Sequence, residues 1–256
     1  MRRLITIPIS HFCEKARWAL GRAGLEYQEE AHVQVIHVIA ARRAGGGRTV
    51  PVLVCDEGVL PESGSIVGYA AQRAPADRAF EPDDPVELAE AVRIERWLDA
   101  DLGPHTRRWT YWEMRDEREL AEAYNLTGVP DWERASFPVL YRPLFEAVKR
   151  VLDVTPETTA DSKLRVRAVF DTVGERLADG RPFLVGERFS RADLSFAALA
   201  APVLMPDQYG IPLPKLHELP AAWAEDIADL RAHPAGAFAL ALFRDERHAT
   251  AAVAAA

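Results

Sequence analysis

The first 73 residues alternate between strand-like and helix-like patterns of hydrophobic positions. An apolar, β-branched run at residues 4–9 is typical of a buried strand. Apolar side chains then recur at helical spacing over residues 11–23, and Gly24 supplies a helix stop signal. The remainder of this part predicts an extended stretch at residues 26–35 and a short helix that ends by residue 43. A hairpin of two strands follows at residues 50–55 and 58–60, and a final helix at residues 63–73. The predicted order is therefore βαβαββα around a mixed sheet.

A stretch rich in proline, aspartate and alanine at residues 74–85 interrupts this periodicity and indicates a linker. Beyond it the pattern is almost wholly helical, with predicted helices at residues 86–102, 113–124, 137–151, 161–179, 190–199 and 221–232. We therefore expect a small α/β domain over residues 1–76, a linker over residues 77–85 and an all-α C-terminal helical bundle over residues 86–248. The alanine-rich end, residues 249–256, has no apolar periodicity and is expected to be a frayed tail.

Charge and cysteine content narrow the classes of function. The chain has 256 residues and a formal net charge of −8, and its basic residues are scattered among acids rather than gathered into a stripe for nucleic acid. No run in the sequence approaches the ~18 apolar residues of a membrane span. The two cysteines, Cys13 and Cys55, supply neither a disulfide framework nor a zinc cluster. We expect a cytoplasmic protein with no metal, no nucleic acid and no membrane partner.

The first candidate site is the strand-to-helix turn at residues 9–13. Ser10 stands where a helix N-cap belongs, and the first backbone N–H groups of the helix have no intrahelical partner there. Those donors and the helix dipole favour an anion, of which a thiolate is one. Lowering a thiol pKa of ~8.5 by two units requires only ~2.7 kcal/mol. From the local pattern alone, Ser10 is equally explained as a helix cap and nothing more.

Two further segments have the features of a site for a peptide-like ligand. A cis bond between Val50 and Pro51 would expose the Val50 N–H and C=O to such a ligand. Farther along, Ser63 can cap the following helix and offer its N–H and hydroxyl to a carboxylate, while Glu62 could receive an ammonium group. Each segment alone is also explained by an ordinary strand start or an ordinary capped helix.

A fourth segment, residues 186–194, has a structural interpretation. Ser190 and Asp193 form a capping box of the S-x-x-D type, and Phe189 and Leu194 have the spacing of a hydrophobic staple. We expect it to begin a buried helix of the helical domain.

Taken together and in this order, the four segments resemble those of the glutathione transferase family. Residues 10–20 resemble its first-helix motif, residues 49–53 its cis-proline strand, residues 62–63 its γ-glutamyl site, and residues 186–193 the capping motif of its helical domain. The resemblance implies a thioredoxin-like N-terminal domain that binds glutathione as cosubstrate. It also implies a homodimer.

The resemblance assigns a role to each matching residue. Ser10 would stabilise the glutathione thiolate, and Val50, ahead of Pro51, would pair through its backbone with the cysteinyl part of glutathione. The remaining assignments concern the two ends of the tripeptide: Glu62 and Ser63 for the γ-glutamyl end, and Arg48, or less readily Lys15, for the glycyl carboxylate.

The first-helix motif also departs from the family's pattern. Many relatives have proline after the catalytic position, where this chain has His11. Other branches have a cysteine at the first motif position, whereas here that position is Ser10 and the nearest thiol is Cys13. An active Ser10 favours conjugation or isomerisation, and a reactive Cys13 would permit thiol–disulfide exchange.

An unusual density of aromatic residues follows the first predicted helix of the helical domain. Trp109, Tyr111 and Trp112 could line a hydrophobic pocket for a small electrophilic cosubstrate, or fill a core or a dimer interface. The function expected is that of a glutathione transferase, which activates the glutathione thiolate for attack on a hydrophobic electrophile. The alternatives are a non-catalytic interaction module of the same fold and a Cys13-dependent glutathione thiol reductase or isomerase.

Overall fold

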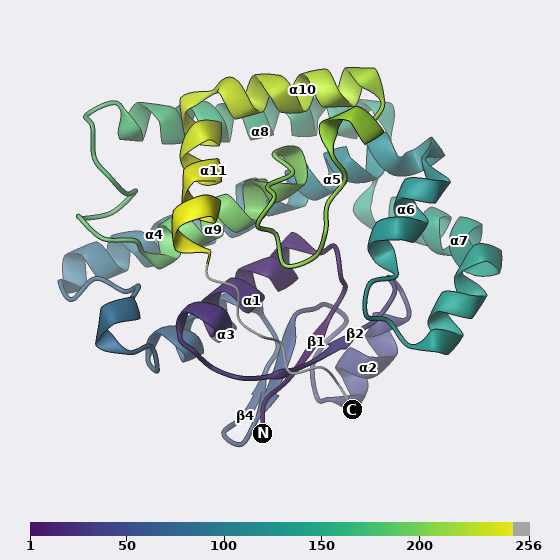
Figure 1. The fold of residues 1–256 in the computed structure, drawn as a ribbon, viewed down its shortest axis with the longest axis horizontal. Coiled ribbons are helices and arrows are strands. Elements are labelled where there is room, and N and C mark those ends of the chain that lie inside the picture. The colour runs from purple at the N-terminus through teal and green to yellow at the C-terminus, as the bar shows by residue number, and fades with distance from the viewer. Residues whose placement is uncertain (248–256) are drawn as a thin grey trace.

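The computed structural model describes residues 1–247, and within them the N-terminal part contains one four-stranded sheet (Figure 1). The strands lie in the order β2 (Gln28–Ala31), β1 (Arg3–Thr6), β3 (Val52–Cys55) and β4 (Gly58–Leu60). β1 pairs parallel with β2 and antiparallel with β3, and β3 pairs antiparallel with β4. The mixed sheet predicted from the pattern is therefore confirmed.

Helices cover both faces of this sheet. Successive side chains of a strand point to opposite faces, so Leu4 of β1 packs on the side of α1 (His11–Arg22) and α3 (Ser63–Ala71). Ile5, the next residue, packs instead against Ala41 of α2 (His37–Arg43). The result is a three-layer α/β arrangement whose α1 and α3 face the rest of the molecule.

The second part of the described chain is helical. Its helices are α4 (Pro85–Asp101), α5 (Gly103–Glu113), α6 (Arg118–Asn125), α7 (Asp131–Leu152), α8 (Pro156–Leu177), α9 (Arg191–Ala200), α10 (Ala221–Ala232) and α11 (Pro234–Glu246). Short 3₁₀ turns are η1 (Ala76–Arg78), η2 (Met114–Asp116), η3 (Ala201–Val203) and η4 (Leu216–Glu218). Every residue of α9 is buried, which makes it the central helix of this part.

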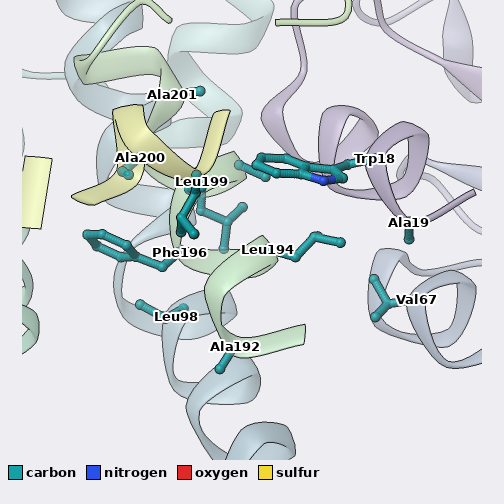
Figure 2. Packing of buried hydrophobic residues seen from close by; sticks show 14 of the residues in the cluster. Trp18, Ala19, Val67, Leu98, Ala192, Leu194, Phe196, Leu199, Ala200 and Ala201 are labelled. Atoms are coloured by element: carbon teal, nitrogen blue, oxygen red, sulfur yellow. The ribbon is translucent and has the colours of Figure 1, made fainter. Parts of the chain in front are cut away.

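One hydrophobic core joins the two parts. Trp18 of α1 lies against the side chains of α9, among them Leu194 and Leu199 (Figure 2). The opposite flank of α9 packs on α4 through residues such as Leu98, while Ala19 of α1 lies beside Val67 of α3. Since apolar burial contributes roughly 25 cal/mol per Å², this shared core holds the parts in a fixed relation.

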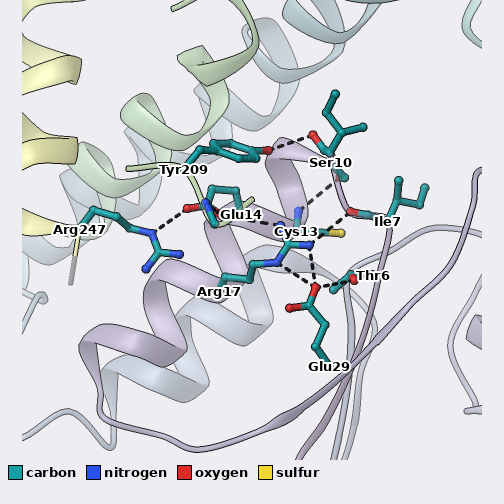
Figure 3. Close-up of polar contacts among 11 residues, drawn as sticks. Thr6, Ile7, Ser10, Cys13, Glu14, Arg17, Glu29, Tyr209 and Arg247 are labelled. Atoms are coloured by element: carbon teal, nitrogen blue, oxygen red, sulfur yellow. Dashed lines mark hydrogen bonds and ion pairs between the residues drawn. The ribbon is translucent and has the colours of Figure 1, made fainter. Parts of the chain in front are cut away.

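The charged residues of α1 reinforce that relation (Figure 3). Glu14 is fully buried and accepts from Arg247 Nε at 2.7 Å and from the Gly210 N–H at 3.1 Å. One turn away, the guanidinium of Arg17 binds Glu29 of β2, with its Nη2 2.7 Å from the carboxylate. A helix enclosed on all sides thus carries charges that are paired with partners on both domains.

A second, smaller cluster lies beyond β2. Met114, Phe137 of α7 and Trp223 of α10 gather there with Val33, which follows β2. The buried Glu133 of α7 accepts the Val33 N–H at 2.7 Å. α6 and α7 therefore attach directly to the end of the sheet.

Two helices were not predicted, and several others differ from the prediction in their bounds. The helix predicted at residues 113–124 corresponds to α6, whereas α5 precedes it and begins at Gly103, with Pro104 in the first turn, where the missing N–H costs nothing. α11 was not predicted at all, although Pro234 starts it in the same way. No helix within residues 1–247 is long and apolar enough to cross a membrane. Residue 248 and the expected frayed tail, residues 249–256, lie outside the described residues.

Candidate functional site

A cleft of about 520 Å³ opens between the two parts of the molecule. The N-terminal part supplies one wall, from Phe12, residues 49–51 and residues 61–65. The helical part supplies the other wall, from Val92, Glu95, Arg96, Asp99, Pro104, Arg107 and Arg191. The cleft therefore combines the two backbone segments that the sequence singled out with charged side chains of α4, α5 and α9.

The loop before β3 presents free backbone groups to this cleft. The Val50–Pro51 peptide bond is cis. Val50 is half-buried and lines the cleft, and within residues 1–247 its N–H and C=O form no backbone hydrogen bond. A ligand with an amide of its own can therefore pair with Val50 in the manner of a β-ladder.

The start of α3 presents a second set of free groups. We predicted Ser63 as the cap, but the N-cap is Glu62, without a capping side chain, and Ser63 is the first helical residue. The first helical hydrogen bond is from the Ile66 N–H to the Glu62 C=O at 3.1 Å, so the N–H groups of residues 63–65 have no intrahelical partner. These groups and the Ser63 hydroxyl lie where an anion is favoured.

A network of mostly buried charges lies along the helical wall of the cleft. Lys15 is 0% exposed and binds Glu95 at 2.8 Å and Asp99 at 2.6 Å. Arg191 binds the other oxygen of Glu95 at 3.0 Å and also pairs with Glu81. Burial raises the pKa of Asp99, although Lys15 opposes the shift. Because both carboxylates hold the Lys15 ammonium, it is the poorer partner for an incoming carboxylate, whereas Arg48 is exposed next to Thr49 at the cleft wall.

Ser10 caps α1 as predicted. Its Oγ accepts the N–H of Cys13 at 3.4 Å, and the residue is half-buried. Ser10 itself is not among the residues that line the cleft, whose α1 contribution is Phe12. Ser10 therefore stands two residues before the cleft wall, with its Oγ engaged as an acceptor, and a hydroxyl can donate while it accepts.

Cys13 is separated from the cleft. Its side chain is 0% exposed between α1 and β1 (Figure 3), and burial raises the pKa of the thiol to about 11 although Arg17 opposes the shift. A thiol in that environment is protonated at neutral pH and out of reach of a disulfide partner. Of the two residues, Ser10 is therefore the more accessible and Cys13 is enclosed.

His11, which stands where many relatives have proline, connects α1 to α5. Its buried ring donates from Nε2 to the Gly103 C=O at 2.9 Å. Burial, with a smaller contribution from Arg107, lowers the pKa of His11 to about 3, so the ring is neutral. Phe12 packs so closely on Gly103 that a Cβ atom added at Gly103 would lie 2.4 Å from the ring of Phe12. The first turns of α1 and α5 therefore meet at the cleft.

The predicted aromatic pocket is divided by the structure. Trp109 is 0% exposed in the core, and its Nε1 donates to Glu113 at 3.2 Å. Tyr111 and Trp112 are half-buried but do not line the cleft. Tyr111 lies one turn beyond Arg107 on the same face of α5, and its ring packs beside that of Phe145. The predicted set omitted Phe12 and Arg107, and only the first belonged to a segment that the sequence had singled out.

Comparison with known proteins identifies the fold and then the family. A thioredoxin-like domain followed by a helical domain is the arrangement observed. The model of the glutathione S-transferase N-terminal domain matches residues 4–78, and that of the glutathione S-transferase C-terminal domain matches residues 136–230. The chain therefore belongs to the glutathione S-transferase family. No curated protein sequence matches it.

Solved structures of low sequence identity share this fold. A glutathione S-transferase from Xanthobacter autotrophicus Py2 has a TM-score of 0.60 and 18% identity, over 96% of this chain and 93% of that one. The theta class glutathione S-transferase from Xanthomonas axonopodis pv. citri with glutathione bound has a TM-score of 0.58 and 20% identity, over 97% of this chain and 98% of that one. Ure2p5 from Phanerochaete chrysosporium was cocrystallised with 1-(S-glutathionyl)-2,4-dinitrobenzene. It has a TM-score of 0.54 and 16% identity, over 95% of this chain and 94% of that one. At these identities the likeness concerns the fold alone.

Proposed function

We propose that this protein binds glutathione in the cleft and activates its thiol for attack on a small hydrophobic electrophile. The observation that carries the proposal is the unpaired backbone of Val50 in the same cleft as the unpaired N–H groups at the start of α3. A tripeptide with a free α-amino acid end requires both features. The glutathione and the glutathione conjugate bound to two proteins of this fold support the same ligand.

Each part of glutathione has a proposed partner. The Val50 backbone would pair with the cysteinyl amide, and the Ser63 N–H and hydroxyl would bind the γ-glutamyl carboxylate. Glu62, exposed at the N-cap of α3, would receive the γ-glutamyl ammonium group. Arg48 would neutralise the glycyl carboxylate, because Lys15 is already held by two carboxylates.

The reaction needs a thiolate held near its target. The Ser10 O–H would donate to the glutathione sulfur, and the N-terminus of α1 would favour its negative charge. The thiol proton passes to water, the sulfur forms a bond to the electrophilic carbon, and the leaving group departs with its electron pair. Tyr111 and Trp112 would contact the apolar part of the electrophile. No step calls for a metal.

Calorimetry of glutathione binding, with thiolate absorbance followed against pH, tests the proposal. Ser63→Ala should weaken binding about tenfold, since a hydrogen bond to a charged group contributes about 1.5 kcal/mol. Thr172→Ala, which removes an exposed hydroxyl of α8 outside the cleft, is the control and should bind as the wild type does. Ser10→Ala should bind glutathione but leave its thiol pKa near the free value.

The outcome also separates the alternatives. No binding at millimolar glutathione would contradict the proposal and favour the non-catalytic interaction module. Activity that survives Ser10→Ala and is lost in Cys13→Ala would favour the reductase or isomerase, which the burial of Cys13 disfavours. By analogy with the family we further propose a homodimer in the cytoplasm.

A further inference from the structure

α5 brings an arginine without a counterion into the cleft. Arg107 lines the cleft on the helical side, and its Nε is buried without a hydrogen-bond partner within residues 1–247. No carboxylate of the described chain lies within ion-pair distance of its guanidinium, in contrast to Arg191 in the same cleft. A buried charge without a partner is costly, so a site of this kind is completed by a ligand of opposite charge.

The neighbours of Arg107 leave its positive charge uncompensated. Burial lowers the pKa of Arg107, and the adjacent Arg108 adds to the shift while Tyr111 opposes it. The ring of His11 is neutral and lies close enough for Arg107 to affect its titration. The guanidinium of Arg108 turns away, to the Leu152 C=O at 2.9 Å and Ser162 Oγ at 3.0 Å.

The acidic residues of the cleft do not serve as the missing partner. Glu95 and Asp99 are neutralised by Lys15 and Arg191 along the helical wall of the cleft. Glu62 stands exposed on the opposite wall, at the N-terminus of α3. The part of the cleft around Arg107 is therefore positively charged and partly desolvated, and it is bordered by the apolar side chains of Phe12 and Pro104.

The position of Arg107 identifies which ligand it faces. Arg107 lies one turn beyond Gly103 on α5, and the Gly103 C=O accepts from the ring of His11, the residue after Ser10, so the arginine is near the point where the sulfur of glutathione would be held. The carboxylates of glutathione would instead lie at Ser63 and Arg48. We propose that Arg107 binds an anionic group, a carboxylate or sulfonate, carried by the electrophilic cosubstrate; this inference rests on the proposed function. The planar guanidinium offers the paired donors that such oxyanions accept.

A matched pair of ligands tests the charge preference without any reaction. Calorimetry with 4-nitrobenzoate and its neutral counterpart 4-nitrobenzamide should show the anion bound about tenfold more tightly, which corresponds to about 1.4 kcal/mol. Arg107→Gln should abolish the preference, and Arg107→Lys should retain part of it. Arg96→Gln is the control: it removes the same charge from an exposed position of the same cleft, where solvent screens it, and should keep the preference.

A kinetic pair tests the same preference during turnover. Glutathione thiolate displaces chloride from 4-chloro-3-nitrobenzoate or 4-chloro-3-nitrobenzamide: the C–S bond forms, the C–Cl bond breaks, and chloride leaves with the electron pair. Arg107→Gln should raise KM about tenfold for the benzoate and leave KM for the benzamide unchanged. Wild-type protein without a preference for the anion, or a preference that persists in Arg107→Gln, would overturn the proposal.

Glutathione binding is measured separately on the same variants. If wild-type protein fails to bind glutathione, the proposed function fails, while the benzoate–benzamide comparison still decides the role of Arg107 as an anion site. If Arg107→Gln weakens glutathione binding tenfold, or raises the thiol pKa of bound glutathione, with no effect on the benzoate, the arginine serves glutathione and the inference is overturned.

Discussion

Ser10 and Cys13, only three residues apart, occupy opposite environments. Ser10 caps α1 and is half-buried, while Cys13 lies one turn inside the helix with no exposed surface. Burial disfavours a charged thiolate and raises the pKa of Cys13 to about 11. Position within a single helical turn therefore decides which of the two side chains is accessible.

This contrast makes a prediction about thiol labelling. Iodoacetamide should modify Cys13 in native protein at least a hundredfold more slowly than in urea-unfolded protein, because the reactive thiolate is suppressed and the sulfur is shielded. Mass spectrometry of labelled peptides measures the two rates. Cys13→Ser should keep transferase activity. Rapid native labelling of Cys13 together with loss of activity in that variant would show that the thiol takes part.

At the scale of elements, the start of α9 shows how a short motif supports a buried helix. Asp193 accepts the N–H of Ser190 at 2.8 Å and that of Leu184 at 2.7 Å, and it also accepts the Ser190 hydroxyl at 2.7 Å. The predicted capping box is therefore confirmed. The same carboxyl also fixes the loop that approaches the helix, which the spacing of the motif did not indicate.

Asp193→Ala should destabilise the protein by about 3 kcal/mol. The change leaves two buried N–H groups without an acceptor, and each unsatisfied group costs about 1–3 kcal/mol. Urea unfolding followed by circular dichroism gives the difference. Asp179→Ala is the control, since Asp179 forms an exposed pair with Arg181, and its removal should have little effect. Equal effects of the two substitutions would contradict the role of the capping box.

The elements also show where prediction from sequence ends. Local periodicity identified the strands and helices of the first domain because each has a strong pattern and a clear stop. It missed α5, since Gly103 and Pro104 indicate a break although both are tolerated in a first turn. Val50 and Ser63 were recognised through backbone chemistry that a motif encodes. Arg107 was not, because the lack of a counterion depends on how α5 packs on α1.

At the scale of the whole molecule, charged contacts join the helical part to the N-terminal part, and two of them bear on the cleft and on the end of the sheet. Near the cleft, Lys15 of α1 binds Asp99 of α4. At the far end, His32, just after β2, binds Glu133 of α7 through Nδ1 at 2.5 Å and Glu30 through Nε2 at 3.0 Å. The cleft is bounded by elements from both parts, so its shape depends on such contacts.

The contact at His32 should make stability depend on pH. Hydrogen bonding to Glu133, supported by Glu30 and opposed by partial burial, raises the pKa of His32 above its ordinary value of 6.5. Folded protein thus binds the proton more tightly than unfolded protein, and the stabilisation is fully present below pH ~6.5 and lost as pH rises through the folded pKa. Wild-type protein should exceed His32→Gln in unfolding free energy at pH 6, and the difference should shrink by pH 8.

Comparison of variants isolates this contribution from other groups that titrate in the same range. Urea unfolding of wild type, His32→Gln and Glu133→Gln at both pH values measures it. Glu133→Gln removes the charge that raises the His32 pKa but keeps an acceptor for the Val33 N–H, so it should reduce the pH dependence without abolishing folding. A wild-type advantage that is equal at pH 6 and pH 8 would show that α7 is held to the sheet by packing alone. Loss of the advantage at high pH, with glutathione affinity falling in parallel, would show that this distant contact also determines the shape of the cleft.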